Sequence, residues 1–262
     1  MPTQKTALIT GASRGIGKAI AYEFARNGYH LYLTCKNNLE LLKDVKLELE
    51  NIQSKWNTIS TETKNLQNTF NISSPPGCHI FQCDIGKIHE VEALFQRIPS
   101  IDIIVNNAGI SHIGLLTDMS EDDWHRVMST NLDSLFYTSK FGVPKMLTNH
   151  RGKIINISSV WGNTGASMEV AYSASKGAVN SFTKALAKEL APSNIQVNAI
   201  ACGMIDTEMN ACFSEEDLHC IIEEIPADRI GKPEEVARLC YMLAEAPEYM
   251  TGQIITMDGG WT

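Results

Sequence analysis

The chain has 262 residues, of which 44% are hydrophobic, so it is long enough to bury one large core, and we expect a single α/β domain. Its formal net charge of −8 argues against a nucleic-acid-binding surface, which is normally basic. No apolar run approaches membrane-spanning length and residues 1–5 lack a signal-peptide core, which predicts a cytoplasmic protein. Seven cysteines without C-x-x-C spacing predict reduced thiols, neither a disulfide framework nor a metal site.

Short apolar runs alternate with helical stretches along the whole chain. The runs lie near residues 6–10, 31–35, 79–83, 101–106, 153–158, 195–201 and 254–257. Strands that alternate with helices form a parallel sheet covered on both faces. We therefore predict a Rossmann-type doubly wound sheet of about seven parallel strands, with the carboxyl ends of the strands along one edge.

The first predicted strand leads into a glycine-rich turn and then a helical pattern from Lys18 to Asn27. Gly11, Gly15 and Gly17 let the backbone turn tightly and approach a pyrophosphate, which the N–H groups at a helix start can hold. The spacing G-x-x-x-G-x-G differs from the usual dinucleotide fingerprint, so a turn without a ligand is the alternative. The strand–turn–helix context favours dinucleotide binding.

The segment at about 50–77 departs from this alternation because it is polar and rich in Asn, Thr and Ser. Loops of this length tend to be functional or disordered. We interpret it as an insertion that makes a solvated surface excursion, with Trp56 and Phe70 as local packing anchors.

Tyr172 and Lys176 form a second chemical motif. They lie four apart in a stretch of helix formers, so both fall on one helix face, where an ammonium can stabilise a phenolate. A free tyrosine titrates near about 10, too high for efficient acid–base work at neutral pH, so a neighbouring cation has a purpose. Ser159 precedes Tyr172 by thirteen residues. The spacing predicts a proton-transfer site, although Tyr-x-x-x-Lys alone also occurs by chance.

Further short motifs accompany these two. They are Asp84 at the end of a predicted strand, Asn106-Asn107-Ala108-Gly109 after the next, Asn131 within a long amphipathic stretch, and Met257-Asp258-Gly259-Gly260 at the tail. In this order the motifs resemble those of the short-chain dehydrogenase/reductase family, nearly from end to end. The resemblance implies a single-domain, NAD(P)-dependent oxidoreductase acting on CH–OH and C=O groups, with a substrate loop at about 203–230.

The resemblance also implies roles for individual residues. Tyr172 is the general acid toward a carbonyl oxygen, Ser159 hydrogen-bonds that oxygen, Lys176 lowers the pKa of Tyr172 and binds the nicotinamide ribose, and Asn131 holds a water that relays protons. Where the family usually has Pro-Gly, this chain has Cys202-Gly203, so the fixed proline φ is lost. The implied cofactor-binding residues are Gly11, Ser13, Arg14, Gly15, Ile16, Gly17, Lys36, Asp84, Ile85, Asn106, Ala108, Gly109, Tyr172, Lys176, Gly203, Ile205 and Thr207.

Charge at the end of the second strand indicates the cofactor. Family members that prefer NAD resemble one another in having an acidic residue there, whereas this chain has Cys35 followed by Lys36. Arg14 in the glycine turn is a second cation that can flank an adenosine 2′-phosphate. The pattern predicts NADPH; the alternative is that both are ordinary surface cations.

The substrate has two candidates. The overall run looks most like bacterial 3-oxoacyl-[acyl-carrier-protein] reductases of fatty acid biosynthesis, which implies a carrier-linked 3-oxoacyl thioester and acyl carrier protein as partner. The segment from Trp161 to Tyr172 instead resembles a Firmicutes branch that reduces the 5-aminopentanone group on a lysine of elongation factor P. Glu169, one turn before Tyr172, can face a cationic amine, so Trp161 and Glu169 are candidate substrate residues. An acidic carrier needs a basic patch, for which the candidates are Lys145, Arg151, Lys153, Lys184 and Lys188.

Two further expectations concern class and assembly. A non-catalytic dinucleotide-binding redox sensor is the rival class, but a sensor needs the glycine turn and not Asn131, Ser159, Tyr172 and Lys176. The stretches 124–147 and 172–190 resemble the helix pair that packs between subunits in the family, and their apolar residues spread around much of the first helix. This predicts a homotetramer.

Overall fold

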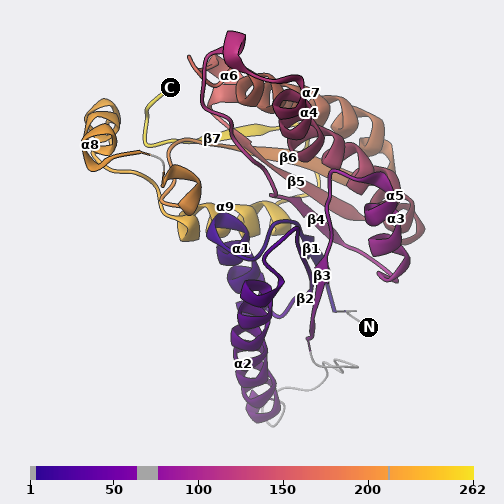
Figure 1. Cartoon of the computed structure of the whole chain (residues 1–262). Helices are drawn as coiled ribbons and strands as arrows, with labels where there is room; N and C mark the ends of the chain where they lie inside the picture. The colour runs from indigo at the N-terminus through magenta and orange to yellow at the C-terminus, as the bar shows by residue number, and fades with distance from the viewer. Residues whose placement is uncertain (1–3, 64–75, 212) are drawn as a thin grey trace.

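Seven parallel strands form one sheet at the centre of the molecule, as the sequence predicts (Figure 1). The computed structural model describes residues 4–63, 76–211 and 213–262, and the side chains of residues 55–63 lie outside that description. The strand order is β3-β2-β1-β4-β5-β6-β7. The strands are β1 Thr6–Ile9, β2 His30–Cys35, β3 Cys78–Gln82, β4 Ile103–Asn106, β5 Gly152–Ser159, β6 Ile195–Cys202 and β7 Ile254–Met257.

The strand order creates a topological switch point beside β1. The chain winds outward from β1 through β2 to β3, and then returns to place β4 on the other side of β1. Because right-handed crossovers leave from opposite sides at such a point, a crevice opens at the carboxyl edge between β1 and β4. This edge is where the candidate site lies.

Helices cover both faces of the sheet (Figure 1). Side chains of α1, α2 and α9, among them Phe24, Leu42 and Val236, pack on one face with Ile9. Side chains of α3, α5 and α7 pack on the other with Leu8. The helices are α1 Gly15–Arg26, α2 Leu39–Thr63, α3 Ile88–Gln96, α4 Glu121–Met128, α5 Ser134–Asn149, α6 Trp161–Thr164, α7 Val170–Leu190, α8 Glu215–Glu224 and α9 Pro233–Glu245. In the described part of the chain, no helix combines the length and apolar character needed to cross a membrane.

Helix α2 reaches into the segment that the sequence analysis interprets as an insertion. The predicted excursion begins at residue 50, but α2 continues unbroken to Thr63. Leu42, Val45 and Leu49 are buried at helical spacing, and Gln53 extends the buried face by donating from its side-chain nitrogen to the Tyr29 carbonyl at 3.0 Å. A polar surface therefore does not prevent helix formation here, because one buried stripe suffices. The predicted anchors, the Trp56 side chain and Phe70, lie outside what is described.

A chain of buried polar side chains ties the helices to the sheet beneath the site. The Asn106 amide on β4 donates to Asn156 Oδ1 on β5 at 2.9 Å, and Asn156 Nδ2 donates to Thr183 Oγ1 on α7 at 2.9 Å. Thr138 on α5 donates to Asn106 Oδ1 at 2.8 Å. All four residues are buried, so each hydrogen bond prevents a costly unpaired polar atom. The network fixes where α5 and α7 lie relative to the strand ends.

Candidate active site

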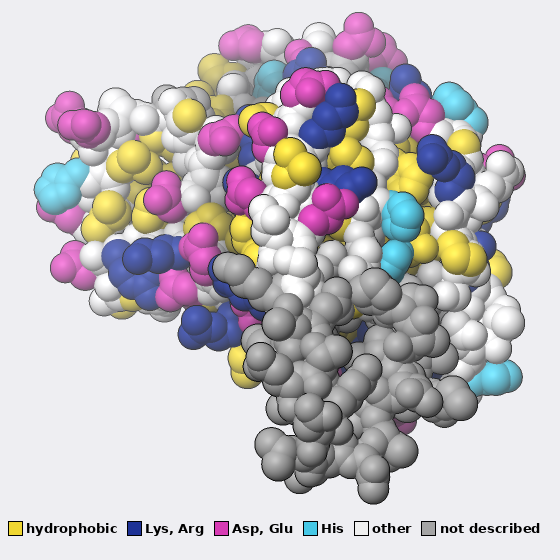
Figure 2. All heavy atoms as spheres, turned by 90° about the horizontal axis from the view of Figure 1, so that it is seen from below, with side chains coloured by type: hydrophobic (Ala, Val, Ile, Leu, Met, Phe, Trp, Pro, Cys, Tyr) yellow, Lys and Arg dark blue, Asp and Glu magenta, His cyan; other side chains and the backbone are white. Residues whose placement is uncertain are grey.

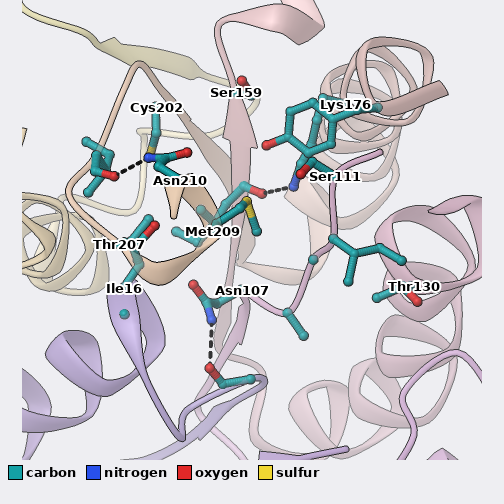
Figure 3. A pocket seen from close by; sticks show the side chains of 18 of the residues that line it. Ile16, Asn107, Ser111, Thr130, Ser159, Lys176, Cys202, Thr207, Met209 and Asn210 are labelled. Carbon is teal, nitrogen blue, oxygen red and sulfur yellow. Dashed lines mark hydrogen bonds between the residues drawn. The ribbon is translucent and has the colours of Figure 1, made fainter. Parts of the chain in front are cut away.

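A cavity of about 1010 Å³ opens at the carboxyl edge of the sheet (Figure 3). Figure 3 shows Ser159 and Lys176 on one side of it, with Thr207, Met209 and Asn210 of the predicted substrate loop on another. Most of the predicted site residues line this one cavity. They are Gly11, Ser13, Arg14, Gly15, Ile16, Gly17, Lys36, Asp84, Ile85, Ala108, Gly109, Ser159, Trp161, Glu169, Tyr172, Lys176, Gly203, Ile205 and Thr207.

The glycine turn has the shape that a phosphate cradle needs. Gly11 and Gly15 have φ of +66° and +54°, where a side chain would be strained. A Cβ on Gly17 would lie 2.3 Å from the Gly11 carbonyl oxygen, so only glycine closes this turn. Arg14, the N-cap of α1, makes no side-chain capping hydrogen bond. The N–H groups of the first turn are thus not engaged by their own cap, and the residues fit a dinucleotide phosphate.

Ser159 and Tyr172 meet although they come from different elements. Ser159 ends β5, and Tyr172 lies in the first turn of α7, which packs against β5. The Ser159 hydroxyl hydrogen-bonds the Tyr172 phenol and accepts the Trp161 backbone N–H at 3.2 Å. Burial raises the pKa of Tyr172, and the hydrogen bond to Ser159 opposes that rise. Tyr172 is therefore a protonated donor at neutral pH.

Lys176 is buried one turn further along α7. Its Nζ donates to the Ile157 carbonyl at 2.9 Å and lies 5.6 Å from the centre of the Tyr172 ring. Burial lowers the pKa of Lys176 to about 8. Among the groups around Tyr172, the hydrogen bond from Ser159 lowers its pKa, and the predicted lowering by Lys176 stays a prediction.

Asn131 lies in a π-helical turn, Ser129–Asp133, between α4 and α5. Its Oδ1 accepts the Ile110 backbone N–H at 2.9 Å, and its Nδ2 donates to the Ile110 carbonyl at 2.9 Å and to Ser175 Oγ at 3.0 Å. A π-helical turn inside a helix commonly marks a functional position. The side chain fastens the cavity-lining Ile110 to α7, and its predicted role in a proton relay stays a prediction.

Asn106 departs from the prediction. Its side chain is committed to the buried network under the sheet edge, and it does not line the cavity. Its neighbour Asn107 does, and donates from Nδ2 to the carbonyls of Thr10 and Gly11 at 2.9 and 3.1 Å. In the Asn-Asn-Ala-Gly motif the second asparagine therefore holds the glycine turn. The two residues alternate between the faces of the strand end, a distinction the motif alone does not make.

Cys202 occupies the position before Gly203 and lies in the cavity wall. It extends β6 by pairing with Ser159 on one side and Met257 on the other. Burial raises the pKa of the Cys202 thiol to about 12, with Lys176 opposing. The thiol is therefore protonated at neutral pH and poorly disposed to oxidation.

Two tryptophans and two carboxylates form the outer part of the cavity, which we call the indole wall: Trp161, Glu169, Glu224 and Trp261. The rings of Trp161 and Trp261 meet edge to face, with centroids 4.8 Å apart. Trp261 donates from Nε1 to Glu224 at 3.2 Å, and Trp161 hydrogen-bonds Glu169. Burial raises the pKa of the Glu169 carboxyl. Sequence reasoning missed Glu224 and Trp261, because no spacing pattern connects the tail with α8.

Both cations predicted to bind a 2′-phosphate have carboxylate partners. Arg14 Nη1 lies 2.5 Å from Glu208 Oε2, and Lys36 Nζ lies 2.9 Å from Asp84 Oδ2. Burial alone would raise the pKa of Asp84, but the hydrogen bond and charge of Lys36 outweigh burial and the pKa is lowered. The cations are thus present at the cavity, each neutralised by an acid.

Comparison with known proteins shows which families and chains this protein is similar to. A family model described as short chain dehydrogenase matches residues 5–75, and one described as enoyl-(acyl carrier protein) reductase matches residues 57–262. The chain is 39% identical to the Bacillus subtilis protein called uncharacterized oxidoreductase YmfI, covering 98% of both chains. It is 39% identical to the 3-oxoacyl-[acyl-carrier-protein] reductase of Thermotoga maritima, covering 98% of this chain and 97% of that one.

A solved structure supports the same relationship. The crystal structure of 3-oxoacyl-[acyl-carrier protein] reductase from Brucella melitensis superposes with a TM-score of 0.86 at 31% identity. The match covers 99% of this chain and 92% of that one. The whole sheet and the helices around the cavity therefore have a counterpart in a related protein.

Proposed function

Because the chain belongs to the short-chain dehydrogenase family, whose members are oxidoreductases acting on CH–OH and C=O groups, we propose that it is an NADPH-dependent ketone reductase. One observation carries this proposal: Ser159, Tyr172 and Lys176 converge in the same cavity as the glycine turn. A redox sensor needs the turn but not a proton donor beside it. The convergence therefore favours catalysis.

The residues supply binding and the proton. When bound, the nicotinamide dinucleotide supplies the hydride. The Ser159 and Tyr172 hydroxyls, which hydrogen-bond each other, can both donate to a carbonyl oxygen placed between them. Tyr172 gives up its proton as negative charge develops on that oxygen. Lys176, with its pKa of about 8, is largely protonated at neutral pH and places a positive charge near the phenolate that results.

The preference for NADPH rests on the charges beside β2. Cys35 ends β2 where an NAD-preferring enzyme would carry an acid, and Lys36 follows it into the cavity. Arg14 lies in the glycine turn of the same cavity. A 2′-phosphate dianion is a stronger partner for Arg14 than the exposed Glu208 carboxylate, so the contact with Arg14 is available on exchange.

The first candidate substrate is a 3-oxoacyl thioester on acyl carrier protein. The reductases of Thermotoga maritima and Aquifex aeolicus with that name are 39% and 37% identical to this chain over nearly all of its length. In such a substrate one methylene separates the ketone from the thioester carbonyl, and the ketone would have to enter the cavity to meet Ser159 and Tyr172.

The predicted basic patch does not frame that mouth. Arg151 pairs with Asp102 and Lys153 contacts the Ala246 carbonyl at the amino edge of the sheet, opposite the cavity. Lys188 is three helical turns beyond Lys176 on α7, about 18 Å along the helix axis. Figure 2 shows acidic and basic side chains interspersed on the described part of the face seen from below. A carrier that docks at the mouth would therefore not contact Arg151, Lys153 or Lys188.

The second candidate is a ketone that carries a primary amine, such as the 5-aminopentanone group on a lysine of elongation factor P. The indole wall favours it: Glu169 and Glu224 are carboxylates, and Trp161 and Trp261 present ring faces that attract cations. Burial raises the pKa of the half-buried Glu169 carboxyl, and a cation beside it would stabilise the charged form.

A direct assay tests the proposal. NADPH oxidation would be followed with acetoacetyl thioester and with a lysine-linked aminoketone, for the wild type, Tyr172→Phe and Glu169→Gln. We expect turnover that depends on Tyr172 in every case. Selective loss of aminoketone reduction in Glu169→Gln would identify the second substrate class, and equal effects of Glu169→Gln on both substrates would exclude a role for Glu169 in substrate choice. Reduction of neither substrate would refute ketone reduction of these two classes.

We propose a cytoplasmic homotetramer. On α5, Phe136 and Leu147 are 49% and 39% exposed, which is unusual for such large apolar side chains and favours burial against another subunit. Val127, Leu135 and Met146, which contributed to the same apolar pattern, are buried within the single chain. Of the apolar residues in this stretch, only the exposed ones can therefore contribute to a subunit interface.

A further inference from the structure

An ion pair crosses the cavity mouth between segments far apart in sequence. Arg14 belongs to the glycine turn, and Glu208 begins a short 3-10 turn, Glu208–Asn210. The pair therefore joins the segment that would hold the dinucleotide phosphates to the predicted substrate loop. Both side chains are more than half exposed, at 55% and 62%, so either can exchange partners.

Neighbouring contacts show that the Glu208–Asn210 turn lies directly over the glycine turn. A Cβ added to Gly15 would be 3.4 Å from Thr207 Cγ2. Asn210 donates from Nδ2 to the Ile205 carbonyl at 2.6 Å, which keeps this turn compact, as the dashed line in Figure 3 marks. The two turns are thus close enough that a single added methyl group on Gly15 would touch Thr207, and the ion pair joins them at this point.

We propose that Glu208 competes with the cofactor 2′-phosphate for Arg14, so that a phosphorylated cofactor releases the Glu208–Asn210 turn and an unphosphorylated one does not. The inference rests on the proposed function, and it adds a residue that sets cofactor selectivity and couples cofactor binding to the substrate loop. A guanidinium offers one planar fork, which faces either the carboxylate or the phosphate. Because the phosphate carries more negative charge than the carboxylate, it displaces Glu208 from Arg14.

Lys36 has a similar pairing with a different consequence. Its partner Asp84 follows β3 on the same side of the cavity and is only 13% exposed. Exchange at Lys36 therefore affects cofactor affinity without moving the substrate loop. The Arg14–Glu208 pair therefore couples the glycine turn to the substrate loop.

Cofactor titrations test the competition. Calorimetry would measure NADPH, NADH, 2′,5′-ADP and 5′-AMP binding to the wild type, Glu208→Gln and Glu216→Gln. Glu216 is an exposed acid on α8, so its variant changes net charge equally. Because exposed ion pairs are weak, we expect Glu208→Gln to tighten NADPH and 2′,5′-ADP by about twofold to fivefold and to leave NADH and 5′-AMP unchanged. The effect should vanish when Arg14 is also replaced by Ala.

Hydrogen exchange tests the coupling. The Asn210 amide donates to the Thr207 carbonyl at 3.0 Å within this turn. We expect 2′,5′-ADP, but not 5′-AMP, to speed exchange of the amides at 207–210 in the wild type, and exchange in Glu208→Gln to be fast without either ligand. Equal tightening of NADPH and NADH, the same gain in Glu216→Gln, or no gain at all would overturn the inference. If the wild type itself does not favour 2′,5′-ADP over 5′-AMP, the proposed cofactor preference fails as well.

Discussion

Burial of Lys176 should cost folding stability, and the cost should depend on pH. Lys176 is 5% exposed, and burial lowers its pKa from the ordinary 10.5 to about 8. At about 1.36 kcal/mol for each pH unit, holding the ammonium in the folded protein costs roughly 3 kcal/mol. The cost is complete below pH 8, shrinks as the pH rises, and disappears above the unfolded-state value of 10.5, because the unfolded chain binds more protons in that window.

Lys176→Met removes the charge and keeps an unbranched apolar stem. We expect this variant to lose activity and to be more stable than the wild type near neutral pH, and we expect the difference in unfolding free energy to fall by about 3 kcal/mol between about pH 7.5 and 10.5. The change with pH is the informative quantity, since differences in the packing of the lysine and methionine side chains do not depend on pH.

Urea unfolding followed by circular dichroism, at one fixed protein concentration, would measure both free energies. Lys184→Met is the matched control, because Lys184 is exposed on the same helix. A stability difference for Lys176→Met that stays constant over this pH range would refute the reasoning. So would an identical slope in the control.

Four further outcomes follow from the site and the surface. Tyr172→Phe should lower kcat by about 10² to 10⁴ while NADPH binding, measured by fluorescence titration, is retained; full turnover would mean that another group is the acid. Lys36→Ala should reduce the ratio of kcat/KM for NADPH over NADH by about tenfold, and an unchanged ratio would remove Lys36 from cofactor selection. Glu169→Gln should cost about 1.5–3 kcal/mol in kcat/KM for aminoketones and nothing for acyl thioesters, unless the indole wall plays no part in binding. Light scattering should report a tetramer at micromolar concentration, and a monomer would contradict the proposed assembly.

The sheet could be predicted from sequence because each strand is a short apolar run between turn residues. Every predicted run overlaps an observed strand, and family motifs then identify the edge at which ligands bind. The Tyr172–Lys176 spacing likewise gave the right helix face, since both residues lie in the first turns of α7.

Other features depend on contacts that sequence spacing does not encode. Asn106 and Asn107 are adjacent and chemically identical, yet one is buried in the Asn156 network and the other lies under the glycine turn. The pairing of Arg14 with Glu208 joins residues 194 apart, and both are individually ordinary surface charges. Helix α2 continues past residue 50 to Thr63, which the polar composition of this segment does not indicate.

The indole wall has a practical consequence for anyone handling this protein. Trp261 lines the cavity, and Thr262 is held against Asp258 through its backbone N–H at 2.8 Å and its hydroxyl at 2.9 Å. An affinity tag fused after Thr262 would therefore start beside the cavity and compete for space with whatever enters it. A tag placed ahead of β1 would start at the opposite edge of the sheet, which makes that end the safer choice for purification and for surface immobilisation.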